Sequence, residues 1–476
     1  MPLLLLLLIA APPDVAVLRW AGPPGSRPGT FAEWQAATGT RDWQVKLVGH
    51  RAGGFEGRVD ILVEADLADT LGPALDTMAA DIAAEGFDVS LYGVASTEPE
   101  SLRAFLQREY QSGLVSAVLV GDLPVAWYQL IDDWNNNGIR DPDEHYEEFP
   151  CDLYLMDLDG EWQDTLVRLG RLDSLVPGTD TILDSHSGHV APEIAVSRLA
   201  ASRFAAEIRD LTSYLDKARR YRHGELRLAD RALVYIDDDW WPNATFWDSD
   251  VGLLYPDRWS CWDPETTRAL DFRPRIDSAA YESVLLCAHS WPAGHCWYFA
   301  NRESTDYLHG HEIPDLDPAA CFWNLFACSN VRYTEWYYCG GRYVFQTATG
   351  LGAIGSSKTG SMLEFDDYYQ PLANGRNLGE AFRYWFERQA DGGFEPWERS
   401  WFYGMCLVAD GTLRPRMTTA VAEPGPGPVR PALNAWPEPF TDRLSVSLAP
   451  GTAGPARLRV FDPAGRQLAA FDWPGS

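Results

Sequence analysis

The sequence predicts an α/β protein made of two adjacent units with parallel sheets, followed by a partial C-terminal β-sandwich. Short apolar runs of strand length alternate with amphipathic helical runs over residues 58–225, and a second alternation covers residues 226–416. This alternation is typical of βαβ units, whose strands lie parallel and are buried on both faces. A Pro/Gly-rich linker at 417–433 separates these units from the last residues, 434–476.

Each unit has its own series of expected strands and helices. The expected elements of the first unit are a strand at 59–64, a helix at 71–84, a strand at 87–92, a helix at 98–112, a strand at 114–121, a strand at 193–199 and a helix at 205–221. Those of the second unit are strands at 232–236 and 352–355, two apolar runs between them, and a helix at 378–389. An acidic insertion separates the strands at 114–121 and 193–199.

Two apolar runs of the second unit end in residues that can carry out chemistry. One ends at His289 and the other at Cys328. Because an open α/β sheet presents its functional groups at the carboxyl ends of its strands, we expect the two side chains to lie close together. An imidazole beside a thiol can accept its proton and create a nucleophile. The alternative is that both are ordinary strand-end residues, since buried cysteine usually packs as an apolar side chain.

Several short motifs, in this order and spacing, resemble the gingipain family of cysteine peptidases, which have a caspase-like fold. The motifs are VLVGD at 118–122 with Pro124 after it, CDLY at 151–154, PEIAVSRL at 192–199, CSNVRY at 328–333, AIGSS at 353–357 and DGTL at 410–413. The resemblance extends over about residues 58–415. It implies two caspase-like subdomains, the second of them catalytic, and a cysteine-type endopeptidase activity on polypeptide substrates.

The resemblance also implies roles for individual residues. Cys328 would be the nucleophile, His289 the base and then the acid, and Asp152 the group that orients the histidine. The backbone amides of Cys328 and Ser290 would hold the oxyanion. Ser290 departs from the His-Gly pair of the family, because a serine Cβ restricts backbone conformations that glycine adopts freely. Asp152 could alternatively be a calcium ligand, together with Asp157 and Asp159.

By the same resemblance, the loop at 356–367 should form a wall of the pocket for the residue before the scissile bond, P1. Its first residues, Ser356, Ser357 and Lys358, are therefore candidates for substrate binding. The stretch at 187–191, where some gingipains carry the acid that selects arginine, has no carboxylate. A basic P1 preference is thus unsupported, although three acids of the 356–367 loop could replace the missing one: Glu364, Asp366 and Asp367.

Residues 133–144 of the acidic insertion match the template of a calcium-binding loop. Acids or amides occupy positions 1, 3, 5 and 9, with a glycine at position 6 and a glutamate at position 12. The predicted ligands are Asp133, Asn135, Asn137, Asp141, Glu144 and the carbonyl of Ile139. Arg140 departs from the template, and the alternative is an acidic, solvated turn. The sequence therefore predicts one structural calcium ion as the only cofactor.

Charge and composition restrict the partners of the 476-residue chain. Its formal charge is −29, from 39 basic and 68 acidic side chains, which argues against nucleic acid or an anionic membrane. Residues 1–11 are apolar and predict a signal peptide, with an N-terminal segment at 12–57, and no other stretch is long enough to span a membrane. The pairing of the eight cysteines stays open.

The C-terminal residues resemble the start of a sorting domain of the type IX secretion system, which exports gingipains. Residues 434–476 contain too few strands to close a β-sandwich. Together these features predict a secreted or cell-surface cysteine endopeptidase, with the secretion machinery as a partner. The alternative is a non-catalytic surface protein that binds calcium and keeps the fold for adhesion or carbohydrate binding. The 20 tryptophans and Ser290 favour this alternative.

Overall fold

The computed structural model describes residues 15–416, except for residue 55 and residues 170–173 and 300–302, and four short strands beyond residue 433. Asp14–Met417 form one compact unit, while Met1–Pro13 and Thr418–Ser476 belong to a second. All the residues proposed from the sequence for catalysis and metal binding lie in the compact unit. We therefore describe the compact unit first.

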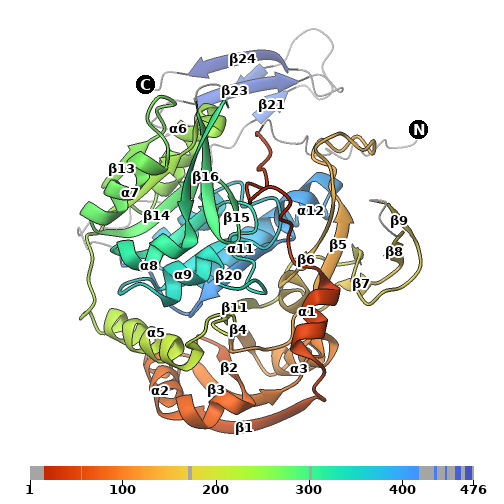
Figure 1. The fold of residues 1–476 in the computed structure, drawn as a ribbon, viewed down its shortest axis with the longest axis vertical. Coiled ribbons are helices and arrows are strands. Elements are labelled where there is room, and N and C mark those ends of the chain that lie inside the picture. Colours follow the sequence, from red (N-terminus) through yellow and green to blue (C-terminus); the bar gives the residue numbers. More distant parts are fainter. Residues whose placement is uncertain are drawn as a thin grey trace. The chain divides into compact units, whose positions relative to one another are not determined.

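An eleven-stranded, mostly parallel sheet runs through the compact unit (Figure 1). The order of the strands is β1-β3-β2-β4-β11-β20-β19-β18-β14-β12-β13. Their bounds are Gln44–Arg51 (β1), Arg58–Glu64 (β2), Asp88–Ala95 (β3), Leu114–Val120 (β4), Ala195–Leu199 (β11), Ala232–Ile236 (β12), Arg258–Cys261 (β13), Tyr281–Cys287 (β14), Ala320–Phe326 (β18), Gly352–Ser356 (β19) and Met405–Ala409 (β20).

The sheet contains two runs of parallel strands that correspond to the two predicted units. Strands β3, β2, β4 and β11 form the first run, with β1 antiparallel at its outer edge. Strands β19, β18, β14, β12 and β13 form the second run. Strand β20 lies between them and is antiparallel to β19. The predicted units therefore share one continuous sheet.

Helices pack on this sheet and against one another. Their bounds are Phe31–Thr38 (α1), Ala65–Ala84 (α2), Pro99–Tyr110 (α3), Leu153–Met156 (α4), Glu207–Arg222 (α5), Trp241–Val251 (α6), Ala269–Ser278 (α7), Ile313–Leu316 (α8), Cys339–Phe345 (α9), Asp366–Ala373 (α10), Leu378–Gln389 (α11) and Pro396–Phe402 (α12), with 3₁₀ turns at Asp238–Trp240 (η1) and Gly310–Glu312 (η2). Helix α2 packs against α5, and α10 packs against α6 and α11.

Smaller sheets surround the main one. They pair β5 (Trp127–Ile131) with β6 (Tyr146–Pro150), β7 (Glu161–Gln163) with β10 (Ser185–Ser187), β8 (Leu166–Arg168) with β9 (Leu175–Pro177), and β15 (His289–Trp291) with β16 (Gly294–Phe299) and β17 (Ser304–His309). In the second unit β21 (Asn434–Trp436) pairs with β22 (Ser445–Ser447), and β23 (Ala456–Phe461) with β24 (Gln467–Trp473).

Hydrophobic burial explains the central strands. Every residue of β14 and of β18 is buried, as expected for strands that are covered on both faces. Helix α11 starts where its sequence carries a capping signal, since the Asn377 side chain accepts from the Glu380 amide at 2.7 Å.

The predicted alternation of strands and helices is confirmed for both runs. Strands β1, β13 and the antiparallel β20 were not predicted. No helix that completes a βαβ unit follows β1 or β20, and β13 is a four-residue strand at the edge of the sheet. The predicted boundary at 225/226 falls between α5 and β12, where the chain passes from one run to the other. The predictions for residues 1–11 and 417–433 lie outside the described residues, and the C-terminal module is described only through its four strands.

Candidate active site

The ends of two neighbouring strands bring His289 and Cys328 to the same part of the sheet. Strands β14 and β18 are parallel, with Cys287 paired to Phe326, so His289 and Cys328 each follow two residues beyond a matched pair. The Ala288 amide donates to the Phe326 carbonyl at 3.1 Å and continues the ladder past the strand ends. The sheet therefore places the two residues beyond the carboxyl ends of neighbouring strands, as predicted.

The imidazole of His289 is fully buried and both of its nitrogens have partners. Its Nε2 lies 2.5 Å from Oδ2 of Asp239, and its Nδ1 accepts from the Arg19 backbone amide at 2.9 Å. The rings of Trp240 and Tyr298 pack on it, with centroids 4.8 and 5.0 Å away. An amide can only donate, so Nδ1 carries a lone pair and the proton is on Nε2, facing the carboxylate. This is the tautomer in which a carboxylate orients a catalytic base.

The acid beside the histidine is Asp239, which makes the predicted contact of Asp152 with His289 wrong. Asp152 is buried elsewhere, where its carboxylate accepts from Arg198 Nε at 2.9 Å and from the Tyr333 hydroxyl at 2.8 Å. A carboxylate held by a guanidinium and a phenol in the core has a structural role.

A signal in the sequence marks the position of Asp239. It belongs to η1 and follows β12, the strand next to β14. Three consecutive aspartates, 237–239, follow that buried strand directly. They stand at the same kind of strand end as His289 and Cys328, and that position was sufficient to propose one of them as the orienting acid.

The thiol of Cys328 is buried and protonated in this arrangement. Burial raises its pKa well above the ordinary value, and the charge of Glu147 raises it further. The ammonium of Lys358 and hydrogen bonds from Thr359 and the Gly360 amide lower the pKa and offset part of this effect. Such a thiol needs a base to become a nucleophile.

The backbone conformation differs at the residues that follow His289 and Cys328. Ser290 has a negative φ angle, so its Cβ causes no strain and the glycine of the family is not required there. Ser329, directly after Cys328, has a φ of 51°, and its amide donates to the Lys358 carbonyl at 2.9 Å. Residues other than glycine adopt such a conformation at a cost of about 1–3 kcal/mol, and these conformations concentrate at functional sites.

The side chains predicted to bind substrate, Ser356, Ser357 and Lys358, point into the interior. All three are fully buried. Ser357 Oγ donates to the Pro150 carbonyl at 2.6 Å, and Ser356 Oγ accepts from the Lys358 amide at 3.2 Å. Their burial does not support their assignment as groups that contact substrate. Only Ser356 belongs to β19, and Ser357 and Lys358 follow its end.

Lys358 is the centre of a buried charge network next to the thiol. Its Nζ lies 2.9 Å from Oδ1 of Asp132 and 2.8 Å from Oε2 of Glu147. Two backbone carbonyls, those of Thr359 and Ser400, complete its partners. A buried ammonium with two carboxylates fixes the loop after β19.

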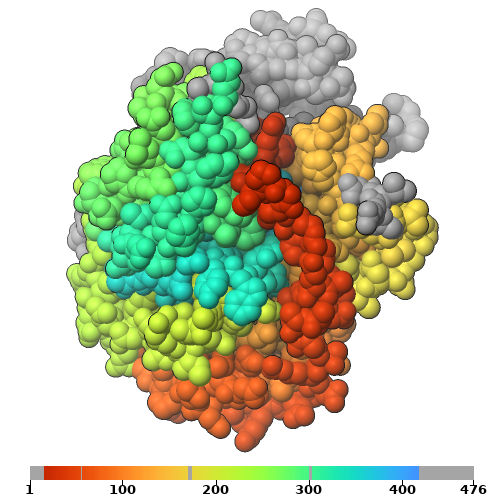
Figure 2. All heavy atoms as spheres, viewed as in Figure 1, coloured from red at the N-terminus to blue at the C-terminus, as the bar shows by residue number. Residues whose placement is uncertain are grey.

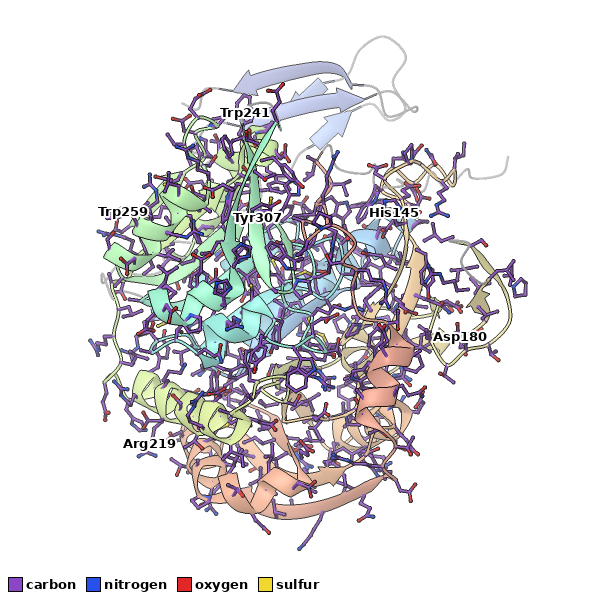
Figure 3. The ribbon with its side chains drawn as sticks, viewed as in Figure 1. His145, Asp180, Arg219, Trp241, Trp259 and Tyr307 are labelled. Carbon is purple, nitrogen blue, oxygen red and sulfur yellow. The ribbon has the colours of Figure 1, made fainter. Side chains whose placement is uncertain are left out.

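A cavity of about 750 Å³ lies beside this network. It is lined by Asp132 and Thr359, by β6 and the loop before it, including His145, and by residues 17–20 and 27–30 of the N-terminal segment. His145 is labelled in Figure 3. The N-terminal segment thus forms one side of this cavity, which the sequence did not indicate; His289 and Cys328 are not among the residues that line it.

The other acids considered for a basic P1 pocket gather elsewhere. Glu364, Asp366 and Asp367 are close to Asp250 of α6, and none of them lines the cavity. Burial, followed by the charges of these three acids, raises the pKa of Asp250 to about 8. This cluster does not contribute a carboxylate to the space near Thr359.

The sequence model of peptidase family C25 matches residues 68–416 of this chain. The chain belongs to this family. It is therefore a cysteine-type endopeptidase of the gingipain family, as the resemblance implied. No curated protein matches the sequence.

A solved structure shares the fold of this C25 peptidase. It is the complex of the pro- and mature domains of RgpB from Porphyromonas gingivalis, with a TM-score of 0.51 and 11% sequence identity. The match covers 88% of this chain and 91% of the other. Within the part of the C25 peptidase that the structure describes, no helix has the length and apolar character needed to cross a bilayer.

The loop predicted to bind calcium in the C25 peptidase is held together by its own polar groups. Asp133 accepts from the Asn137 and Gly138 amides, both at 3.1 Å. Glu144 accepts from the Trp134 amide at 2.9 Å and from the Asp141 amide at 2.8 Å.

The donor atoms of this loop suit a hard cation. Five of its side chains offer carboxylate or amide oxygens, the donors that calcium prefers: Asp133, Asn135, Asn137, Asp141 and Glu144. The template assigns the carbonyl of Ile139 as a sixth donor. The residues present therefore fit a calcium ion.

Another group of possible ligands in the C25 peptidase lies on the surface. Among the described residues, Asp159, His189 and Glu193 form the group whose ligand atoms all lie within 4.8 Å of one another. Asp157, named as an alternative calcium ligand, is instead 2.5 Å from His186 Nε2 in the core. All eight cysteines are unpaired.

Proposed function

We propose that Cys328 and His289 form the catalytic pair of this C25 peptidase and that Asp239 positions the histidine. The observation that supports this proposal most directly is the arrangement of the three residues at the strand ends. His289 and Cys328 follow paired positions of β14 and β18, and Asp239 holds His289 through Nε2. That contact leaves Nδ1 as the nitrogen able to accept a proton.

The reaction follows from these positions. Nδ1 of His289 accepts the proton of the Cys328 thiol, and the thiolate attacks the carbonyl carbon of the substrate. The negative charge that develops on the carbonyl oxygen is held by the backbone amides of Cys328 and Ser290. The protonated histidine then donates to the leaving amine, and water hydrolyses the thioester with the histidine again acting as base.

Hydrolysis of a diverse peptide library tests the catalytic pair. Cys328→Ala and His289→Ala should each abolish cleavage, and the double variant should lose no more than either single variant, because the two residues act as one unit. Cys261→Ala is the matched control, since Cys261 is partly exposed and lies on the edge strand β13. Full cleavage by Cys328→Ala would refute the assignment, and failure of the wild-type enzyme to cleave any peptide would favour a non-catalytic surface protein.

We also propose that the loop at 133–144 binds one structural calcium ion. Support comes from its oxygen-rich side chains and from the amide contacts that organise them. A ligand that binds only the folded state raises the melting temperature with its concentration. Calcium chelation should therefore lower the Tm.

A paired comparison within the loop tests the calcium proposal. The double variant with Asp133→Ala and Glu144→Ala should not respond to calcium. Asp143→Ala should respond as the wild type does, because Asp143 is an exposed loop residue that is not a predicted ligand. If the double variant retains the calcium-dependent rise in Tm, the loop is only a turn.

We further propose that the peptidase is exported. The apolar residues 1–11 support a signal peptide, and the resemblance of residues 434–476 to a sorting domain supports the type IX system as the route. In a host that has this system, the full chain should appear outside the cells. Deleting residues 434–476 should keep it inside, and unchanged export of that variant would exclude the route.

A further inference from the structure

The loop after β19 runs alongside the residues that follow the candidate nucleophile. The Ser329 amide donates to the Lys358 carbonyl at 2.9 Å, and the Val331 amide donates to the Ser356 carbonyl at 3.1 Å. Both bonds join backbone atoms, so they do not depend on the identity of the side chains. They fix the position of the loop relative to Cys328.

Two hydrogen-bond donors of this loop face the sulfur of Cys328. They are the side chain of Thr359 and the backbone amide of Gly360. Gly360 has a φ of 117°, and a Cβ there would lie 2.6 Å from the Trp401 carbonyl oxygen. Glycine alone suits this conformation, so the amide at position 360 is a fixed part of the backbone. Thr359 is therefore the donor that a side-chain substitution can remove.

The hydroxyl of Thr359 has a second partner, the carboxylate of Glu147. Its Oγ1 donates to Oε1 of Glu147 at 2.7 Å, and the Thr359 amide donates to Oε2 at 3.2 Å. A hydroxyl carries one proton and two lone pairs. While that proton faces Glu147, Oγ1 can only accept a hydrogen bond from the thiol, so this arrangement suits the protonated form of Cys328.

Loss of the thiol proton reverses the arrangement. The thiolate is an acceptor, so the hydroxyl of Thr359 can turn its proton from Glu147 to the sulfur. Glu147 stays held after this turn, because it also binds the Thr359 amide and the Lys358 ammonium, the latter at 2.8 Å. A hydrogen bond to a charged acceptor is about twice as strong as one between neutral groups. Thr359 therefore binds the thiolate more tightly than the thiol.

The charges around the sulfur permit this exchange. Glu147 and Lys358 both act on the thiol, and His289 is its proposed base. The carboxylate of Glu147 disfavours the thiolate, whereas the ammonium of Lys358 favours it. Because the ammonium binds Glu147 directly, the negative charge beside the sulfur is paired inside the protein.

The hairpin of β5 and β6 supplies the two carboxylates that hold this loop. Asp132 follows β5 and lies 2.9 Å from Nζ of Lys358, and Glu147 belongs to β6. Figure 2 shows the hairpin in light orange on the surface, beside the N-terminal segment in red. A hairpin at the surface thus positions a hydroxyl at the nucleophile.

We propose that Thr359 is a further catalytic residue of this C25 peptidase and that its hydroxyl stabilises the thiolate of Cys328. The inference rests on the proposed function of Cys328 and His289. The thiol proton passes to Nδ1 of His289, while the proton of Thr359 stays on its own oxygen and changes only its direction. No covalent bond to Thr359 forms or breaks, so its effect is confined to the stability of the thiolate.

The pH dependence of Cys328 alkylation in the purified full chain tests the proposal. Thr359→Val keeps the shape of the side chain and removes the hydroxyl. The midpoint of its alkylation profile should therefore move up by at least about one pH unit, a tenfold effect that corresponds to about 1.4 kcal/mol. Its kcat/KM should fall at least about tenfold as well. Thr359→Ser retains a hydroxyl and should keep a profile close to that of the wild type.

A matched control separates this effect from the loss of a buried hydroxyl as such. Thr347→Val removes a hydroxyl that donates to the Tyr343 carbonyl at 2.6 Å and has no part in the proposed reaction. This variant should lower the free energy of unfolding and leave both the alkylation profile and kcat/KM at their wild-type values. A purely structural role of Thr359 would give the same pattern in Thr359→Val.

Two outcomes overturn the inference and leave the catalytic assignment in place, provided that alkylation of Cys328 still depends on His289. One is a Thr359→Val variant with the wild-type alkylation profile and kcat/KM. The other is a loss in Thr359→Ser as large as that in Thr359→Val, because serine keeps the hydroxyl. If the wild type cleaves no peptide and Cys328 reacts equally fast in His289→Ala, the proposed function falls and this inference falls with it.

Discussion

The two runs of parallel strands in the central sheet have the same architecture but use their polar strand ends differently. In the first run, Glu64 at the end of β2 pairs with Arg41 at 2.7 Å, and Arg198 of β11 pairs with Asp152 at 2.8 Å. In the second run, Nε2 of His289 after β14 meets the carboxylate of Asp239, and Nδ1 accepts an amide hydrogen. Charges that neutralise each other stabilise a fold, whereas an imidazole with an unprotonated nitrogen can act as a base once the amide that it accepts from moves away.

The comparison teaches that chemistry depends on the partners of a residue as well as on its place at a strand end. Asp152 and Asp239 are both acids near buried strands of the same protein. Arg198 and Tyr333 bind the carboxylate of Asp152, whereas Asp239 is the acid that contacts His289. Replacing each aspartate by asparagine, and comparing the effects on activity and on stability, is therefore the sharpest test of the difference between the two runs.

The largest expected effect comes from changing the positioning acid. Asp239→Asn should lower kcat by about 10²–10⁴ with little change in KM, because the amide favours the wrong tautomer of His289. Asp239→Glu should recover part of the rate, since a carboxylate is restored. Both constants and the pH profile of kcat should be measured. If Asp239→Asn keeps the wild-type kcat and pH profile, Asp239 does not position the histidine.

The corresponding change in the first run should act on stability instead. Asp152→Asn leaves the buried guanidinium of Arg198 without its carboxylate, which costs about 3–5 kcal/mol of unfolding free energy for a broken buried pair. Denaturant unfolding measures this loss of free energy. The fraction of the variant that stays folded should keep the wild-type kcat. A variant that is as stable as the wild type but inactive would reverse the roles of the two aspartates.

The buried Lys358 network should be the next most sensitive site. Lys358→Met removes the cation and leaves Asp132 and Glu147 buried without their shared partner. The cost should be about 3 kcal/mol of unfolding free energy, less if one carboxyl takes up a proton. Adding Glu147→Gln to Lys358→Met should restore part of the stability. Independent, additive effects of the two changes would contradict the network.

A smaller effect is expected for Asp237, the first aspartate after β12. Burial, followed by the charge of Asp238, raises its pKa to about 9. The folded state therefore holds this proton at pH values where the unfolded chain has released it, and its contribution to stability falls as the pH rises from about 4 to 9. Asp237→Asn should flatten the decline of Tm between pH 5 and about 9. An unchanged slope would show that the carboxyl is ionised in the fold.

Much of the fold and part of the site could be predicted from the sequence. Buried strands of the second run are marked by continuous apolar residues, and their ends fix His289 and Cys328. Asp239 was missed because the choice among several acids depends on three-dimensional partners, which the pairing of Asp152 with Arg198 shows. The position of Arg19 could not be foreseen, because it depends on backbone contacts between segments 270 residues apart.

The central claim is that His289, positioned by Asp239, activates Cys328. It is tested most directly by the rate at which a small alkylating reagent modifies each cysteine of the full chain, followed by peptide mass spectrometry. The account predicts that Cys328 reacts faster than the other six buried cysteines at neutral pH and that its rate falls to theirs in His289→Ala. Asp239→Asn should give an intermediate rate. An alkylation rate at Cys328 that is the same in the wild type and in His289→Ala would contradict the claim.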